Sequence, residues 1–331
     1  MTRPPVARRQ RQRGVAVITA LLLTALAITI VASLFWQQQV QVRSMENQRL
    51  HLQTKWILRG SIDFARFALR EDGFDPRGRN ATFLDGIWAT PLAETRLDDY
   101  IERERVEGEN FDATLSGQIT DAQARYNLTN LALNRSVNPA QVAAFGRLLQ
   151  NVRVDPALAQ AAAQAVASSQ GAASALVRPP PGTVTTPTPA GQGGGGQQMA
   201  FVAVDDLLSV PGFTPQAVAA LRDFVVVLPQ ATAVNVNTAP AEVLAAVVED
   251  CSLAQANALT VSRKQAYFKT LADFIAALNG KNAIAGVDIG VKSSYFLVLS
   301  RVRLDRAALD AQALIYRDPS LKTSLVSIRE N

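Results

Sequence analysis

An uncharged stretch of 22 residues, Val15 to Trp36, constrains this chain of 331 residues more than any other feature. As a helix rising roughly 1.5 Å per residue, it would be about 33 Å long, close to the thickness of the hydrocarbon core of a bilayer. The preceding segment, Met1 to Gly14, has no acidic residue and carries Arg3, Arg8, Arg9, Arg11 and Arg13. Because an excess of arginine holds its end of a membrane helix in the cytoplasm, the sequence predicts a single-pass anchor with a cytoplasmic N-terminus and an extracytoplasmic bulk.

The charge balance argues against nucleic acid as a partner. The formal net charge of +5 arises from 33 Lys and Arg against 28 Asp and Glu. Without the five leader arginines, 28 basic residues balance 28 acidic residues, so the rest of the chain has no excess of cations for phosphate binding. The one cysteine, Cys251, excludes an intramolecular disulfide and, with apolar neighbours, is expected to fill a core.

Three interpretations of the N-terminus remain open. A secretory signal peptide would be cleaved near Ala25-Leu26-Ala27, but the apolar run continues beyond that point to Trp36. A plain uncleaved anchor fits the same apolar length. The third interpretation comes from similarity, because residues 11–23, RQRGVAVITALLL, resemble the class III leader of type IV pilins and of the pseudopilins of type II secretion.

This resemblance implies a processing site. A prepilin peptidase would remove residues 1–14 by cutting between Gly14 and Val15, and would methylate the new N-terminus at Val15. Glycine suits such a site because it lets the backbone unwind into a protease. Most pilins carry a glutamate at the fifth mature position, where this chain has Thr19. Among pseudopilins, the lack of that glutamate is typical of the K-type minor pseudopilin, whose place in the family is the filament tip.

The helical pattern continues beyond the membrane segment, from Gln37 to about Leu69, without a proline. The sequence therefore predicts one long helix with an apolar half, residues 15–36, and an amphipathic half, residues 37–69. Helical spacing places one set of residues on a single side, and we expect that side to pack on a sheet: Met45, Leu52, Trp56, Gly60, Phe64 and Phe67. Gly60 is expected to mark a close packing contact.

The remaining chain predicts an α+β fold with an insertion. Residues 73–80 are rich in turn formers, strands are expected around 111–126, 294–304 and 311–317, and the region 138–278 is helical in pattern. A pilin-like α/β domain, 70–130 and 285–331, would thus hold its antiparallel sheet against the long helix. The inserted helical domain, 131–284, would contain a flexible proline- and glycine-rich loop at 178–198.

Three further segments resemble the K-type family: residues 119–128, 205–214 and 234–244. In that family the last two belong to small helical subdomains of SAM-like type. Local physics predicts helix starts at Thr214-Pro215 and at Asn237-Thr238-Ala239-Pro240, each with a capping residue and a proline. The string Val210-Pro211-Gly212-Phe213 is similar to a helix-hairpin-helix turn, but the second glycine that binds phosphate is missing.

Residues for catalysis are scarce. The single histidine, His51, lies on the amphipathic helix, and one histidine with one cysteine cannot form a closed zinc site. No nucleophile elbow or phosphate-binding loop is present in the sequence, so we predict no enzyme and no cofactor. Calcium binding is the one metal function that the sequence leaves open. Oxygen ligands for calcium are present in three acidic clusters, Asp98-Asp99, Glu102–Glu109 and Asp205-Asp206.

The resemblance implies a minor pseudopilin at the tip of the type II secretion pseudopilus. Its partners would be the I, J and H types of minor pseudopilin, the prepilin peptidase, the major pseudopilin and the inner-membrane assembly platform. The protein would start as a single-pass inner-membrane protein and nucleate a filament for export of folded proteins across the outer membrane. Two alternatives are a generic membrane-anchored periplasmic binding or scaffold protein and an anchored hydrolase.

Overall fold

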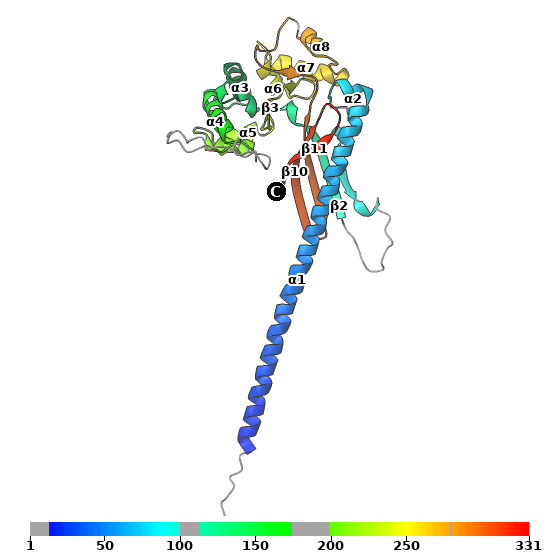
Figure 1. Cartoon of the computed structure of the whole chain (residues 1–331), viewed down its shortest axis with the longest axis vertical. Coiled ribbons are helices and arrows are strands. Elements are labelled where there is room, and N and C mark those ends of the chain that lie inside the picture. The colour runs from blue at the N-terminus through cyan, green and yellow to red at the C-terminus, as the bar shows by residue number, and fades with distance from the viewer. Residues whose placement is uncertain (1–12, 100–112, 174–198, 279, 331) are drawn as a thin grey trace, which may run out of the picture.

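The predicted membrane segment and the amphipathic segment after it form one uninterrupted helix. The computed structural model describes residues 13–99, 113–173, 199–278 and 280–330, and its first element is helix α1, Arg13–Phe74. At roughly 1.5 Å per residue, α1 is about 93 Å long. Its N-terminal half projects away from the rest of the molecule, whereas its C-terminal half lies along a sheet (Figure 1). The helix passes the predicted end at Leu69, because no proline lies between Leu69 and Pro76.

The predicted turn at 73–80 is partly helical. A short second helix, α2, Pro76–Asn80, begins directly after the end of α1. The side chain of Asp75 caps it by accepting a hydrogen bond from the backbone N–H of Arg77 at 2.8 Å, and Pro76 occupies the first turn. The segment 73–80 therefore contains the end of α1 and a short capped helix rather than an open loop.

The described strands form a five-stranded antiparallel sheet in the order β1-β2-β9-β10-β11. Two of these strands precede the insertion and three follow it, so the sheet is built from two distant parts of the sequence, as predicted. Strands β2, β9 and β10 were predicted, but the two edge strands, β1 and β11, were not. Their bounds are β1, Leu92–Arg96; β2, Ala113–Asp121; β9, Tyr295–Leu304; β10, Ala307–Arg317; and β11, Thr323–Glu330.

The helical insertion fills the chain between β2 and β9 and has its own core. Its helices are α3, Pro139–Asn151; α4, Leu158–Ala173; α5, Pro215–Leu221; α6, Ala241–Val247; α7, Leu253–Gln265; and α8, Leu271–Ala277. The predicted loop 178–198 lies outside the described residues. Short two-stranded pairs join the helices, namely β3, Tyr126–Asn127, with β6, Val225–Val226; β4, Ala132–Leu133, with β5, Ser136–Val137; and β7, Val234–Asn235, with β8, Ile289–Gly290.

The sheet has two buried faces because its strands alternate. On β9, Phe296, Val298 and Val302 face α1, where they join the same core cluster as Leu58 and Leu69 of the helix. The alternate residues of the sheet, including Leu297 and Leu314, pack instead against residues of the insertion such as Val226 and Leu228. At this end of the sheet the strands thus lie between α1 and part of the insertion. The long helix packed on an antiparallel sheet confirms the predicted fold class.

A buried ion pair fastens α1 to the sheet. Arg317, at the end of β10, donates through Nη1 to Asp72 Oδ2 at 3.0 Å and to the backbone carbonyl of Leu69 at 2.7 Å. The side chains of Arg317 and Asp72 are only 2% and 4% exposed, and the Arg317 guanidinium lies 4.8 Å from the ring centre of Phe296. Burial raises the pKa of Asp72, and the hydrogen bond from Arg317 opposes that shift. This pair joins the last turns of α1 to the C-terminal hairpin.

A buried polar cluster joins the insertion to the sheet. Asp121, at the end of β2, accepts hydrogen bonds through Oδ2 from Asn235 at 2.9 Å, from Thr238 at 2.6 Å and from Ser293 at 2.6 Å. Its other oxygen, Oδ1, accepts from the backbone N–H of Gln123 at 2.8 Å. These donors come from the start of the insertion (Gln123), from its interior (Asn235 and Thr238) and from the segment just before β9 (Ser293), so the cluster ties the insertion to the sheet where the chain leaves it and returns.

Asp121→Asn should destabilise the protein by about 1–3 kcal/mol. The NH₂ group of asparagine would replace one of the two carboxylate oxygens, and the hydrogen bonds that this oxygen accepts would be lost. Desolvation raises the pKa of the Asp121 carboxyl in the folded protein despite its hydrogen bonds. A raised folded-state pKa contributes stability that is present at low pH and is lost as pH rises from the unfolded value, about 3.9, through the folded value. Urea unfolding of the full chain in detergent at several pH values should therefore show this pH dependence in the parent and not in the variant. A parallel pH profile in both proteins would contradict this account.

Candidate functional site

The predicted processing residues lie in the first turns of α1. Gly14 and Val15 directly follow Arg13, where the helix begins. Thr19 is exposed, and its hydroxyl donates to the backbone carbonyl of Ala16 at 3.0 Å. Thr24 makes the same contact with Leu21. Thr19 therefore presents a neutral side chain bonded to its own helix.

The N-terminal half of α1 fits a membrane anchor. Within the part of the chain that the structure describes, α1 is the one helix that is long and apolar enough to cross a bilayer, and its apolar window buries nothing inside the molecule. Leucines and isoleucines project on all sides, for example Leu21, Leu22 and Ile28. Such an all-round apolar surface is stable in lipid or against other apolar helices.

The C-terminal half of α1 packs on the sheet through the face opposite to the predicted one. The buried residues of this half are Leu58, Ile62, Ala65 and Leu69, together with Thr54 and Asp72. The predicted packing residues, by contrast, point away from the sheet. The prediction of the packing face was wrong because this half of α1 has two apolar faces, and helical periodicity alone does not distinguish which one a sheet will cover.

The uncovered face forms an exposed stripe along α1. We define the exposed stripe as the residues that are 48–66% exposed on this side: Met45, Leu52, Trp56, Phe64, Phe67 and Phe74. Arg59 lies over the ring of Trp56 at 5.5 Å, and Arg70 lies over the ring of Phe74 at 5.7 Å. The stripe continues the apolar surface of the membrane half. Exposed aromatic patches of this kind mark contact surfaces.

An apolar groove borders the exposed stripe. It lies between α1, the segment 87–92 and strand β2, and has a volume of about 250 Å³. Phe64 and Ala68 line it on the helix side, and Ile87, Pro91 and Ile119 line it on the sheet side. The groove therefore continues the apolar surface of the exposed stripe onto the sheet side.

Gly60 lies on the same side as the exposed stripe. A methyl group added at its Cα would have no heavy atom within 4 Å among the described residues, so the close packing expected at Gly60 is not found within this part of the chain. Because Gly60 has no side chain, the helix surface between Trp56 and Phe64 is low, and small residues of this kind allow the backbone of a second helix to approach closely.

Gly60→Ala is expected to stabilise the isolated protein by about 0.5–1 kcal/mol, because alanine is the better residue in a helix interior and open space surrounds the position. The thermal unfolding midpoint of the full chain in detergent measures this. Gly86→Ala is the matched control. Its methyl group would lie 2.7 Å from Asp72 Oδ1 and Trp88 Nε1, so that variant should lose stability. A lower midpoint for Gly60→Ala would show that the glycine has a contact within the chain.

The predicted helix starts had different outcomes. Thr214 caps α5 as expected, since its hydroxyl accepts from the backbone N–H of Ala217 at 3.2 Å and Pro215 follows it. The second predicted start is confirmed, since α6 begins directly after Pro240, but the predicted cap is wrong, because Pro240 is the N-cap and no side chain caps the helix. Asn237 instead holds the backbone of Phe268 through both of its amide atoms, at 2.8 and 2.9 Å. Asn237 therefore ties the segment before α6 to the segment before α8.

The acidic clusters do not form a metal site within the described part of the chain, where no group of three or more His, Cys, Asp or Glu side chains could hold an ion. Asp205 pairs with Arg222 at 2.7 Å, and Asp206 accepts from the backbone N–H groups of Val202 and Ala203. Glu102–Glu109 lie outside the described residues. His51 is exposed on α1.

Comparison with known proteins identifies the family. A family model described as type II secretion system protein K matches residues 234–292, and the model of the first domain of the same protein matches residues 124–230. A type II secretion system protein K of Pseudomonas aeruginosa is 30% identical over 301 residues, which span 89% of this chain and 86% of that protein. A second one, from Pectobacterium carotovorum, is 27% identical and is covered to 93%, as is this chain.

A solved structure has the same fold. One chain of the crystal structure of the GspK-GspI-GspJ complex from the enterotoxigenic Escherichia coli type 2 secretion system superposes with a TM-score of 0.61. The match covers 87% of this chain and 99% of that chain at 17% sequence identity. With a long α1, a split antiparallel sheet, a helical insertion and these sequence matches, the chain belongs to the type II secretion system protein K family, the K-type minor pseudopilins.

Proposed function

We propose that this protein sits at the tip of the type II secretion pseudopilus and nucleates the filament with other minor pseudopilins, for export of folded proteins across the outer membrane. Its role is structural, and no catalytic step is part of the proposal. It begins as an inner-membrane protein with its N-terminus in the cytoplasm and its bulk in the periplasm.

The exposed stripe on α1 is the observation that carries this proposal. It presents Trp56, Phe64 and Phe67 to solvent on a helix whose opposite face is already buried on the sheet. Covering such a stripe with an apolar helix face removes water from it, at about 25 cal/mol for each Å² of apolar area. A partner that carries its own long apolar helix suits both the stripe and the membrane half that continues it.

The I- and J-type minor pseudopilins are the proposed partners on this stripe. The solved neighbour of the same fold is a complex of GspK with GspI and GspJ, which supports an equivalent assembly here. The H type and the major pseudopilin would join below, on the inner-membrane assembly platform. The generic scaffold alternative would need no sibling subunits of this kind.

The tip location is supported by Thr19 and by the insertion. A carboxylate near the bilayer core costs on the order of 2.5–3.5 kcal/mol, and pilins offset this cost by pairing it with the N-terminal amine of a neighbouring subunit. Thr19 bonds to Ala16 of its own helix and offers no charge for such a pair. The insertion, on the sheet face away from α1, would obstruct subunits stacked above it (Figure 1).

Co-expression of the full chain with the I- and J-type proteins of the same bacterium tests the proposal. A stable complex of the three is expected after extraction in detergent, together with loss of secretion when the gene for this protein is deleted. A chain that purifies alone, and whose deletion leaves secretion intact, would refute the proposed function.

Processing at Gly14 gives a second, independent prediction. Mass spectrometry of the protein purified from membranes should find a mature N-terminus at Val15 that carries one methyl group. Gly14→Val should leave the leader attached, because a β-branched residue resists the unwound backbone that cleavage requires. Val15→Ala, which changes the neighbouring position but keeps the glycine, should be cleaved as the parent is. A mature protein that starts at Met1 or near Ile28 would contradict a prepilin leader.

A further inference from the structure

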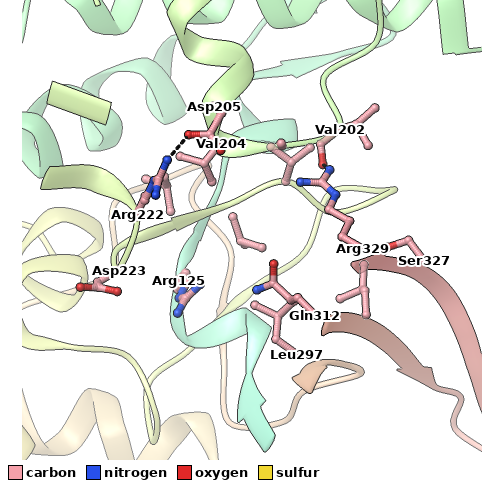
Figure 2. Close-up of a pocket in the computed structure, with 15 residues that line it drawn as sticks. Arg125, Val202, Val204, Asp205, Arg222, Asp223, Leu297, Gln312, Ser327 and Arg329 are labelled. Carbon is pink, nitrogen blue, oxygen red and sulfur yellow. Dashed lines mark hydrogen bonds and ion pairs between the residues drawn. The ribbon is translucent and has the colours of Figure 1, made fainter. Parts of the chain in front are cut away.

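A second cavity lies on the far side of the sheet from the exposed stripe. It has a volume of about 380 Å³ and is enclosed by the insertion and the last two strands (Figure 2). Three arginines surround it, each from a different segment. Arg125 follows β2, Arg222 follows α5, and Arg329 lies on β11. We call this cavity the arginine pocket.

The sheet side of the arginine pocket consists of two cross-strand rows. Leu297, Leu314 and Ser327 are direct neighbours on β9, β10 and β11, and Gln312 is paired with Arg329 in the adjacent row. Val225, Val226 and Val227 line the pocket from the insertion. The cavity thus combines apolar walls with hydrogen-bond donors at its rim, as sites for ligands with one polar group do.

The three arginines differ in what holds them. Arg222 pairs with Asp205 at 2.7 Å, and Arg329 donates to the backbone carbonyl of Val202 at 2.5 Å. Within the described residues, no hydrogen bond or ion pair involves the guanidinium of Arg125. In Figure 2 this group lies between Asp223 and Gln312 without a dashed line to either. Arg125 is therefore a partly buried cation whose guanidinium finds no acceptor among the residues that the structure describes.

The charge of the lining leaves room for an anion. Three guanidinium groups line the pocket against two carboxylates, of which Asp205 is already paired with Arg222. Burial lowers the pKa of Arg125, and the attraction of Asp223 opposes that shift. A carboxylate is the group that matches a guanidinium in shape, since both are planar and form two parallel hydrogen bonds.

We propose that the arginine pocket binds an acidic side chain on an extended segment of a partner protein. The carboxylate pairs with Arg125, and the neighbouring apolar side chains of the segment lie on Leu297, Leu314 and Val226. An extended polypeptide suits this place because β11 is the last strand of the sheet and its outer backbone edge pairs with no described strand. Edge strands accept an added strand through backbone hydrogen bonds. This site is separate from the exposed stripe and does not depend on the proposed function.

Titration of the full chain in detergent with a short peptide tests the proposal. The probe is acetyl-Val-Glu-Val-amide, and its isostere acetyl-Val-Gln-Val-amide is the comparison. With ¹⁵N-labelled arginine, the side-chain signal of Arg125 is assigned by its loss in Arg125→Gln. The acidic peptide should shift this signal and the isostere should not. Arg125→Gln should weaken binding by about tenfold, the loss expected when a charged hydrogen-bond partner is removed.

Two further variants keep the test independent of folding defects. Arg153→Gln, at an exposed arginine outside the pocket, should bind the peptide as the parent does. Ser327→Glu places a carboxylate inside the pocket, so it should abolish peptide binding and leave the protein folded, whereas Ser327→Gln should not. Equal binding of the two peptides, or undiminished binding by Arg125→Gln, would overturn the proposal. Sodium propionate that binds as tightly as the acidic peptide would overturn the assignment to a polypeptide.

Discussion

Alanine at both Trp56 and Phe64 is expected to remove the protein from its complex with the I- and J-type minor pseudopilins without unfolding it. Aromatic residues at the centre of an interface commonly contribute about 2 kcal/mol or more each, which is about a 30-fold loss of affinity for each replacement. Both side chains are exposed and contribute little to the core, so the unfolding free energy should change by about 0.5 kcal/mol or less. Co-purification in detergent and the thermal midpoint measure the two effects on the same sample.

Two controls separate an interface from a folding defect. Val261→Ala changes an apolar residue of similar exposure, 59%, on α7, and should leave the complex intact. Leu58→Ala and Leu69→Ala change the opposite, buried face of α1 and should destabilise the fold by about 2–5 kcal/mol. Retention of the complex by the Trp56 and Phe64 variant would exclude the exposed stripe as the assembly surface. Its unfolding together with loss of the complex would show that the stripe is part of the core.

Arg317→Met is expected to lower the free energy of unfolding by about 3–5 kcal/mol, the usual result of leaving one member of a buried ion pair alone. The Asp72 carboxylate would remain buried without its cation, and the backbone carbonyl of Leu69 would lose its donor. Because Arg317 also lies over Phe296, the variant loses a favourable contact with the aromatic core. Urea unfolding of the full chain in detergent measures the loss.

The double variant Asp72→Leu and Arg317→Met should recover most of that stability, since removal of both charges also removes the cost of burying them. Arg301→Met is the surface control. Arg301 pairs with Asp310 at 2.7 Å, but both side chains are at least 40% exposed, so its loss should cost about 1 kcal/mol or less. Equal losses for Arg317→Met and Arg301→Met would show that burial of the Asp72–Arg317 pair adds nothing.

Features with a strong local pattern were predictable from the sequence. Three local patterns each predict an element: the apolar run from Val15, the absence of proline between Val15 and Pro76, and the alternation around Phe296. Strand β11 escaped prediction because it lies at the edge of the sheet, where nearly every residue is exposed and no alternation marks a buried face. The side-chain cap expected within Asn237-Thr238-Ala239-Pro240 does not form for another reason. The Asn237 side chain bonds instead to the backbone of Phe268, which is distant in the sequence.

The candidate sites divide in the same way. The positions of Gly14, Val15 and Thr19 on α1 follow from the sequence, because processing of a leader depends on a short linear segment. The exposed stripe does not. Its residues were recognised as one face of the helix, but they were predicted to be buried and are exposed. The sequence did not distinguish the two faces, because both are apolar between Thr54 and Phe74. The arginine pocket gave no signal at all, because Arg125, Arg222 and Arg329 come from three unrelated segments.

Local chemistry, read along the chain, was enough to predict the long apolar helix, the strands with a buried face and the family of the protein. The tertiary structure alone decided which side of α1 the sheet covers and which side stays exposed. It also decided that Asp72 meets Arg317 and that Asp121 joins the insertion to the sheet. The physical reason is that periodicity records how apolar a face is, whereas burial depends on what other segments, far away in the sequence, bring to that face.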